Sequence, residues 1–239
     1  PILYTFDDRE DILDILEDIT GSRLTYSYYR VGGVMKDIDD NFIWKTREFI
    51  KTLRSRFPMY ETLVGGNAIL HRRMKDISVI TPDMARRYGV TGAVLRGSGI
   101  NYDVRKNAPY SVYPEFDFDV PLGSRGDCMD RYNVKFAEME QSLRIIEQAL
   151  DKLPEGDVRA KVKKIKLKPG MTSFSVETAR GELTYLLIGD GSDIPYRLKI
   201  RVPSFSNLST MPELCADMLL SDLVTTMGSF DLVIPEIDR

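Results

Sequence analysis

The last residues of the chain combine side-chain types that can hold charge and protons. Residues 229–239 read as the end of a helix followed by a short acidic tail that stops on Arg239. Asp231 and Glu236 lie in this tail, and carboxylates can take part in proton movement when their surroundings shift their pKa values. Pro235 lies between them, so helical periodicity does not give their relative orientation. The alternative interpretation is that both carboxylates form salt bridges with Arg239.

Basic residues in the preceding segments form a second set of candidates. Arg180 lies at 177–182, between two expected strands, where an ordinary turn is the simplest interpretation. Alternation along the next expected strand places three cations on one face, namely Arg197, Lys199 and Arg201. Such a face is usually solvated. The alternative is a cationic wall that binds an anion or stabilises developing negative charge.

The sequence offers little for metal chemistry. Cys128 and Cys215 form no CxxC pair, and His71, in a basic stretch, is the single histidine. Three carboxylates alternate with apolar residues and could bind a hard cation, namely Glu115, Asp117 and Asp119. More often such carboxylates face solvent and pair with basic residues. We therefore expect no metal ion or cluster bound by this chain.

Nucleotide, nucleic-acid and membrane-spanning functions are also disfavoured. The Gly-Asp-Gly at 189–191 lacks the third glycine of a dinucleotide fingerprint and precedes a strand. The net charge of −3 gives no general attraction to nucleic acid. No apolar run approaches the roughly 20 residues that a membrane helix needs. Five lysines at 161–168 are more typical of a solvated loop or edge strand than of the alternative, a phosphate or lipid site.

Apolar residues at helical spacing predict the elements that position these candidates. Helices are expected at 7–20, 40–57, 61–73 and 126–153, with Pro58 closing the second. Thr81-Pro82-Asp83 predicts the start of a short helix that ends near Gly89. Residues 92–119 are expected to form an ordered but irregular connection.

Strands are expected in the second part of the chain, at 172–177, 182–189 and 195–202. The turn at 189–193 makes the last two a β-hairpin, and a final helix is expected from about Pro212 to Gly228. This order predicts an α+β fold: a helical core with long helices and a small antiparallel sheet. We expect one domain over residues 1–239.

Short segments spread along the chain together resemble the D subunits of respiratory complex I (NADH–quinone oxidoreductase), a family related to nickel–iron hydrogenase large subunits. The tail resembles the hydrogenase pattern S-x-D-P-C-x-x-C-x-D-R, but Val233 and Glu236 occupy the two metal-binding cysteine positions. A soft-metal site without its thiolates is typical of the quinone-reducing relatives. The other matching segments are 26–33, 89–92, 95–99, 101–106, 118–121, 126–127, 130–132, 142–146, 179–182, 190–192, 195–197, 203–205 and 207–208.

The resemblance implies a hydrogenase large-subunit-like fold and a role in a proton-translocating NADH–quinone oxidoreductase. It implies a peripheral position on the cytoplasmic side of the cell membrane, and a small iron–sulfur subunit as partner, whose cluster delivers electrons to quinone. Other peripheral-arm and membrane-arm subunits are further implied partners, and nucleic acid is not. The implied pocket residues are Asp231, Val233, Glu236 and Arg239, with Arg180 near the same cavity.

Departures from the family leave alternatives open. Family members begin with a long N-terminal region that carries the histidine and tyrosine of the headgroup site. We therefore expect an N-terminally truncated chain that is inactive in isolation, and a purely structural or assembly role is one alternative. Residues 153–172 form a shorter segment than in most members, as in relatives that oxidise a reduced deazaflavin. A membrane-bound hydrogenase relative is a further alternative, although Val233 and Glu236 argue against an active metal site.

Overall fold

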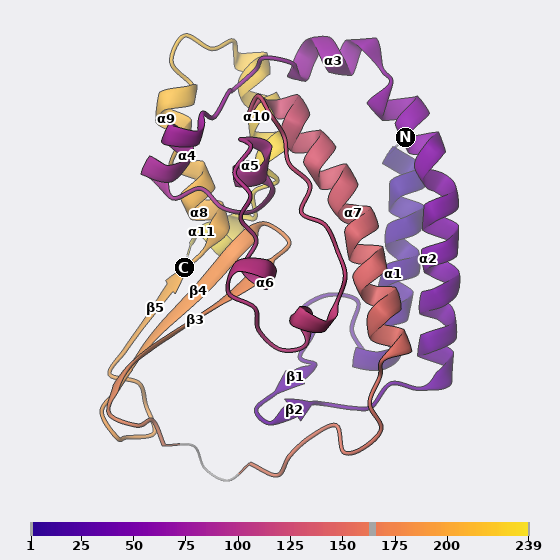
Figure 1. Cartoon of the computed structure of the whole chain (residues 1–239), viewed down its shortest axis with the longest axis vertical. Helices are drawn as coiled ribbons and strands as arrows, with labels where there is room; N and C mark the ends of the chain where they lie inside the picture. Colours follow the sequence, from indigo (N-terminus) through magenta and orange to yellow (C-terminus); the bar gives the residue numbers. More distant parts are fainter. Residues whose placement is uncertain (1, 163–165, 239) are drawn as a thin grey trace. The chain divides into compact units, whose positions relative to one another are not determined.

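A computed structural model describes residues 2–162 and 166–238 (Figure 1). The chain divides into two compact units. The first comprises Pro1–Asn67 and Ile146–Ile165, and the second comprises Ala68–Ile145 and Lys166–Arg239. The boundary falls within the long helix α7 (Cys128–Asp151), and the expectation of one domain over the whole chain stays a prediction.

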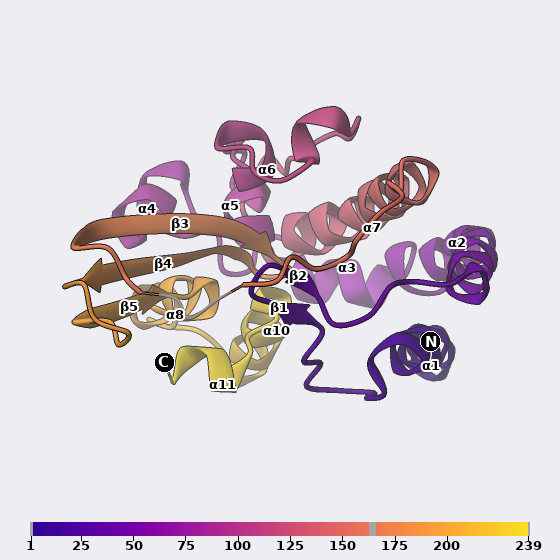
Figure 2. The same ribbon diagram turned by 90° about the horizontal axis from the view of Figure 1, so that it is seen from below.

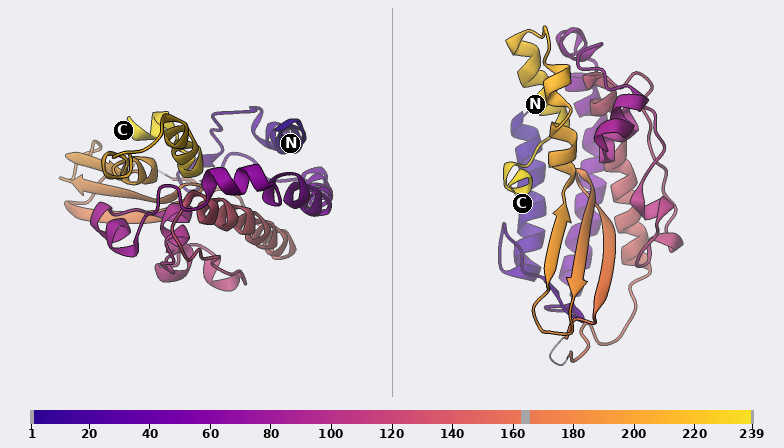
Figure 3. Two further views of the ribbon diagram at one scale, coloured as in Figure 1. Left: turned by 90° about the horizontal axis from the view of Figure 1, so that it is seen from above. Right: turned by 90° about the vertical axis from the view of Figure 1, so that its left-hand side faces the viewer.

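The first unit is built on two helices that lie side by side, α1 (Ile2–Thr20) and α2 (Asp40–Tyr60) (Figures 1 and 3). Leu13 and Ile15 of α1 and Ile50 of α2 are buried. The Asp39 carboxylate accepts the Phe42 N–H at 2.8 Å and so caps the start of α2. Strands β1 (Tyr29–Arg30) and β2 (Gly33–Val34) form a short antiparallel ladder.

Pro58 does not end α2, which contradicts the expected boundary at Phe57. The helix continues through the proline to Tyr60 and passes into a π-helical turn, η1 (Glu61–Gly65). There the Glu61 N–H bonds to the carbonyls of both Phe57 and Pro58, so the ladder resumes beyond the missing proline donor. The expected helix at 61–73 is accordingly replaced by η1 and a separate helix, α3 (Ala68–Met74).

The second unit contains a three-stranded antiparallel sheet, which confirms the expected strands and hairpin (Figure 2). Strands β3 (Gly170–Thr178), β4 (Gly181–Gly189) and β5 (Arg197–Arg201) lie in that order. Thr178 pairs with Gly181, so only Ala179 and Arg180 connect β3 to β4. This two-residue turn fixes the position of Arg180 in the sheet.

Helices of the second unit surround a core that includes Ile80, Val94 and Phe230. Helix α4 (Pro82–Tyr88) begins as expected, because the Thr81 hydroxyl accepts the Met84 N–H at 3.2 Å. The further elements are α5 (Gly92–Gly97), α6 (Val104–Asn107), the 3₁₀ turn η2 (Tyr113–Glu115), α8 (Pro203–Leu208), α9 (Met211–Leu214), α10 (Leu220–Phe230) and α11 (Ile234–Ile237).

Two expectations for this unit were wrong. Residues 92–119 contain α5, α6 and η2, so they are more regular than their glycines and prolines suggested. The single helix expected at 212–228 is broken, since α9 ends at Leu214 and α10 begins at Leu220. Asp217 lies between them with φ at +57°, a left-handed conformation that no helix interior accommodates. The α+β class itself is confirmed.

Candidate functional site

The tail begins where α10 ends, at Asp231. This residue adopts a left-handed conformation (φ 57°, ψ 51°), and its N–H bonds to the Met227 and Gly228 carbonyls, both at 3.3 Å. The reversal closes the helix as a glycine would. The chain then leads into α11, with Val233 as the N-cap residue.

The β3–β4 turn and the tail meet through Arg180 and Asp231. The Arg180 Nε donates to the Asp231 carbonyl at 3.1 Å, and its Nη2 contacts the Asp231 carboxylate at 3.1 Å. Both side chains are partly accessible, 31% for Arg180 and 49% for Asp231. Two candidate residues from distant segments of the sequence therefore lie in direct contact.

Lys135, which sequence reasoning missed, completes this group from α7. Its Nζ donates to the Ser229 carbonyl at 3.0 Å and lies 3.8 Å from the Asp231 carboxylate. Burial lowers the pKa of Lys135, and the neighbouring Arg180 and Arg131 act in the same direction. Nothing in the sequence set Lys135 apart, because only the packing of α7 against the tail reveals its role.

The other tail residues are fastened by α8. The Glu236 carboxylate accepts both the backbone N–H of Ser204, at 3.3 Å, and its hydroxyl. The same hydroxyl oxygen accepts the Val233 N–H at 3.3 Å, so one serine holds two positions of the tail. Arg239, the remaining predicted member of the site, lies outside the described residues.

Arg131 supports the tail from inside the second unit. It is fully buried, and its Nε donates to the Ser229 hydroxyl at 2.9 Å. Its Nη1 donates to the carbonyls of Ser78, at 3.1 Å, and Gly126, at 2.7 Å. The guanidinium also lies 5.1 Å from the centre of the Phe230 ring. Burial lowers the pKa of Arg131, and the contacts to Ser229, Ser78 and Gly126 satisfy three of its five N–H donors.

A buried ion cluster lies beside this support, around Arg96 of α5. Arg96 contacts Glu138 through Nε and Glu177 through Nη1, the latter at 3.0 Å. Asp103 lies 3.7 Å from Arg96 and 2.6 Å from Arg105. Burial raises the pKa of Glu177 and nearby Asp103 adds to this, whereas Arg96 and Arg105 oppose it. Three carboxylates thus share two arginines in a largely buried place.

Two glycines let α5 approach the β3–β4 turn closely. Gly92 has φ at +68°, and a Cβ on it would overlap the Arg180 carbonyl. Gly181 has φ at +133°, and a Cβ on it would lie 2.6 Å from the Gly92 nitrogen. The two backbones touch only because neither residue carries a side chain. This contact fixes the turn that presents Arg180.

Gly92→Ala is therefore expected to destabilise the protein by about 2 kcal/mol, from the left-handed φ and from steric overlap. The free energy of unfolding, measured by urea titration, would show it. Gly21→Ala is the matched control, because Gly21 has a similar φ of +71° but a Cβ there meets nothing within 4 Å. Equal losses in the two variants would contradict a role for the close approach.

The remaining candidates follow their simpler interpretations. Arg201 donates to the Gly89 carbonyl at 2.7 Å and lies 3.6 Å from Glu182, while Arg197 and Lys199 are exposed. Asp117 and Asp119 pair with Arg144 at 2.7 Å and 2.9 Å, as expected for solvent-facing carboxylates. Among the described residues, no cluster of three or more potential metal ligands occurs.

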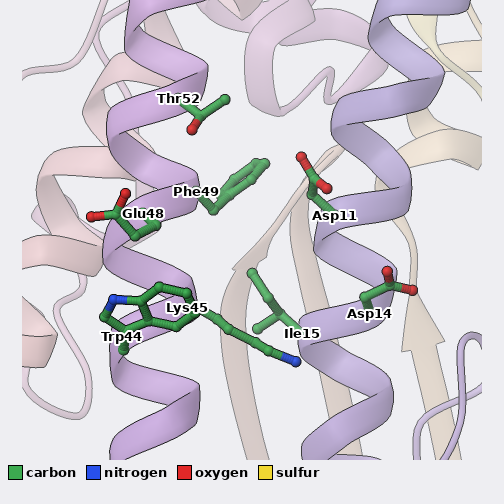
Figure 4. A pocket seen from close by; sticks show the side chains of 8 residues that line it. All are labelled: Asp11, Asp14, Ile15, Trp44, Lys45, Glu48, Phe49 and Thr52. Carbon is green, nitrogen blue, oxygen red and sulfur yellow. The ribbon is translucent and has the colours of Figure 1, made fainter.

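Two hollows among the described residues have defined linings. One of about 300 Å³ lies between α1 and α2 (Figure 4). Its lining includes Asp11, Asp14 and Ile15 of α1 and Trp44, Glu48 and Phe49 of α2. Another of about 400 Å³ is lined by residues of α4 and α9. Neither contains Arg180 or a tail residue, so within this chain the tail forms a partly exposed surface. No described helix is long and apolar enough to cross a membrane.

Comparisons with known proteins extend over the whole chain. The family model described as "Respiratory-chain NADH dehydrogenase, 49 Kd subunit" matches residues 1–173 and 162–239. The NADH-quinone oxidoreductase D subunit of Desulfotalea psychrophila is 57% identical over 241 residues, covering 100% of this chain and 65% of the relative. The protein of the same name from Syntrophobacter fumaroxidans is 56% identical with the same coverage. The chain thus spans slightly less than two thirds of the length of these relatives.

Proposed function

Because the chain belongs to the family of the 49 kDa subunit of respiratory-chain NADH dehydrogenase, we propose that its tail forms one wall of the pocket where quinone is reduced. The expected family is thereby confirmed, and the helices with small antiparallel sheets agree with its hydrogenase large-subunit-like fold. The observation that best supports the proposal is the Arg180–Asp231 contact, which joins two segments that the resemblance assigned to one cavity.

The residue types of this surface suit quinone chemistry. Reduction of a quinone to a quinol takes two electrons and two protons. Val233 is half-buried and gives an apolar contact for the ring, while Arg180 and Lys135 surround the Asp231 carboxylate with positive charge. Such a group can bind a polar headgroup and compensate charge that develops during reduction. Glu236, held by Ser204, fixes the last turn of the wall.

The proposal includes partners and a location. The electrons come from an iron–sulfur cluster in a small partner subunit, with NADH as the donor that the relatives' names indicate. Other peripheral-arm subunits and the membrane-arm subunits complete a proton-translocating oxidoreductase, in which this chain lies peripherally at the cytoplasmic side of the membrane. Without the partner subunit that holds the cluster, this chain has no quinone reductase activity.

Val233→Met in the assembled complex is expected to change quinone KM or inhibitor affinity about threefold to tenfold, because a longer side chain enters the ring contact. Steady-state kinetics with a soluble quinone, together with inhibitor titration, would measure the change. The matched control is Val224→Met, at an exposed position on α10. Intact assembly with unchanged KM and unchanged inhibition would count decisively against the pocket assignment.

A further inference from the structure

Lys135 has two features that no other described cation at the tail combines: an amine that can lose its proton, and a position behind the Asp231 carboxylate. Its ammonium group bonds to the Ser229 carbonyl and lies 3.8 Å from the carboxylate. Arg180 and Arg131, the other cations here, carry guanidinium groups, which keep their protons far more firmly than an amine. A change of charge at this place therefore falls on Lys135.

The surroundings of Lys135 act in opposite directions on its proton. Burial, Arg180 of the β3–β4 turn and Arg131 of α7 lower its pKa from 10.5, while Asp231 of the tail and Glu138 of α7 raise it. Burial is the largest cause, and the net pKa is lowered. The side chain is only 30% accessible, so bulk water compensates little of the desolvation.

We propose that Lys135 is the positioning residue that sets the charge of the tail site: with its ammonium protonated, Asp231 is held from two sides, and with the amine neutral, only Arg180 holds it. This rests on the proposed function for its effect on quinone, but not for its effect on Asp231. Lys135 acts through the carboxylate and the Ser229 carbonyl, and we assign it no contact with substrate.

The consequence is an alkaline limb in the affinity for quinone. As pH rises through the pKa of Lys135, the protonated fraction falls, Asp231 loses one partner and KM rises. A partner at 3.8 Å in a half-accessible place contributes modestly, so we expect KM to rise about threefold to fivefold.

Two substitutions separate charge from structure. Lys135→Arg keeps a positive charge at every accessible pH, so KM should stay low and the alkaline limb should disappear. Lys135→Met removes the charge at every pH, so KM near neutrality should already equal the high value that the unmodified protein reaches in alkali. Lys199→Met, at an exposed position on β5, is the control and should leave the limb unchanged.

The measurement is quinone KM and kcat from about pH 6 to about pH 10, in assembled complex that contains the full-length protein. Competitive acetic anhydride labelling with mass spectrometry gives the pKa of the Lys135 amine independently of quinone. A lowered labelling pKa and an alkaline limb that vanishes in Lys135→Arg support the inference.

A limb that persists in Lys135→Arg overturns the inference, as does a labelling pKa at or above that of Lys199. If Val233→Met changes KM and the Lys135 variants do not, the inference fails and the proposed function stands. If neither position changes KM, the proposed function and the inference both fail.

Discussion

Arg96→Met is expected to destabilise the protein by about 3–5 kcal/mol, because it removes the cation that three carboxylates share in a buried place. Arg96 is 3% exposed and contacts Glu138, Glu177 and Asp103. Without it, Arg105 is the cation that remains beside Asp103 and near Glu177 among the described residues. Unfolding by urea, followed by circular dichroism, would give the loss.

A second substitution tests whether charge is the cause. Glu177→Gln removes one carboxylate from the cluster, so the double variant should lose clearly less stability than the sum of the two single losses.

The pH dependence of stability has a defined sign. The pKa of Glu177 is raised from 4.5 in the folded protein, so folding favours its neutral form. The stability that this protonation contributes is fully present below pH 4.5 and is lost as pH rises through the pKa of the folded state. The loss of stability in Arg96→Met should therefore be smallest in acid. If the two single losses add strictly and the loss in Arg96→Met does not depend on pH, charge is not the cause.

Arg131→Met is the second large expected effect, a loss of about 3 kcal/mol. Methionine relieves the cost of burying a charge, but it leaves the Ser78 and Gly126 carbonyls without their guanidinium donor. Because Arg131 also bonds to Ser229 and contacts Phe230, the end of α10 should loosen as well. Thermal unfolding would give the loss of stability, and amide hydrogen exchange at 226–231 would show the loosening.

The matched control for Arg131 is Arg125→Met. Arg125 is exposed and forms an ion pair with Asp76 at 3.2 Å, so its loss should cost less than about 0.5 kcal/mol. Similar losses at the two positions would mean that burial of Arg131 does not determine its contribution. Unchanged hydrogen exchange at the end of α10 in Arg131→Met would remove it from the support of the tail.

The sequence predicted those helices and strands whose ends are determined by residues within one turn of the end. Thr81 and Gly89 delimit α4 because a hydroxyl cap and a left-handed residue act within one turn. The strands follow from alternation and turn composition. The predicted end of α2 at Phe57 was wrong because a helix tolerates the single hydrogen bond that Pro58 removes where it gains other contacts. Helix α11 was missed because four residues are too few to show helical periodicity.

The candidate site was predictable only in part. The resemblance to a family implied that Arg180 and Asp231 lie at the same cavity. The two residues are far apart in sequence, so their spacing alone did not predict the contact. Lys135 and Ser204 were missed because their roles arise from α7 and α8 packing against the tail. A lysine on a helix and a serine after a proline are too common for the sequence to distinguish them.

Because only two residues connect β3 to β4, the length of this turn determines the geometry of the site. Thr178 pairs with Gly181, and Arg180 reaches Asp231 only from this register. An inserted or deleted residue in this turn would redirect the side chain even with every amino acid of the site retained. Homologous sequences that keep the arginine but differ here by one residue should therefore not be assumed to keep the ion pair, and alignments of this segment need gap placement as much as residue identity.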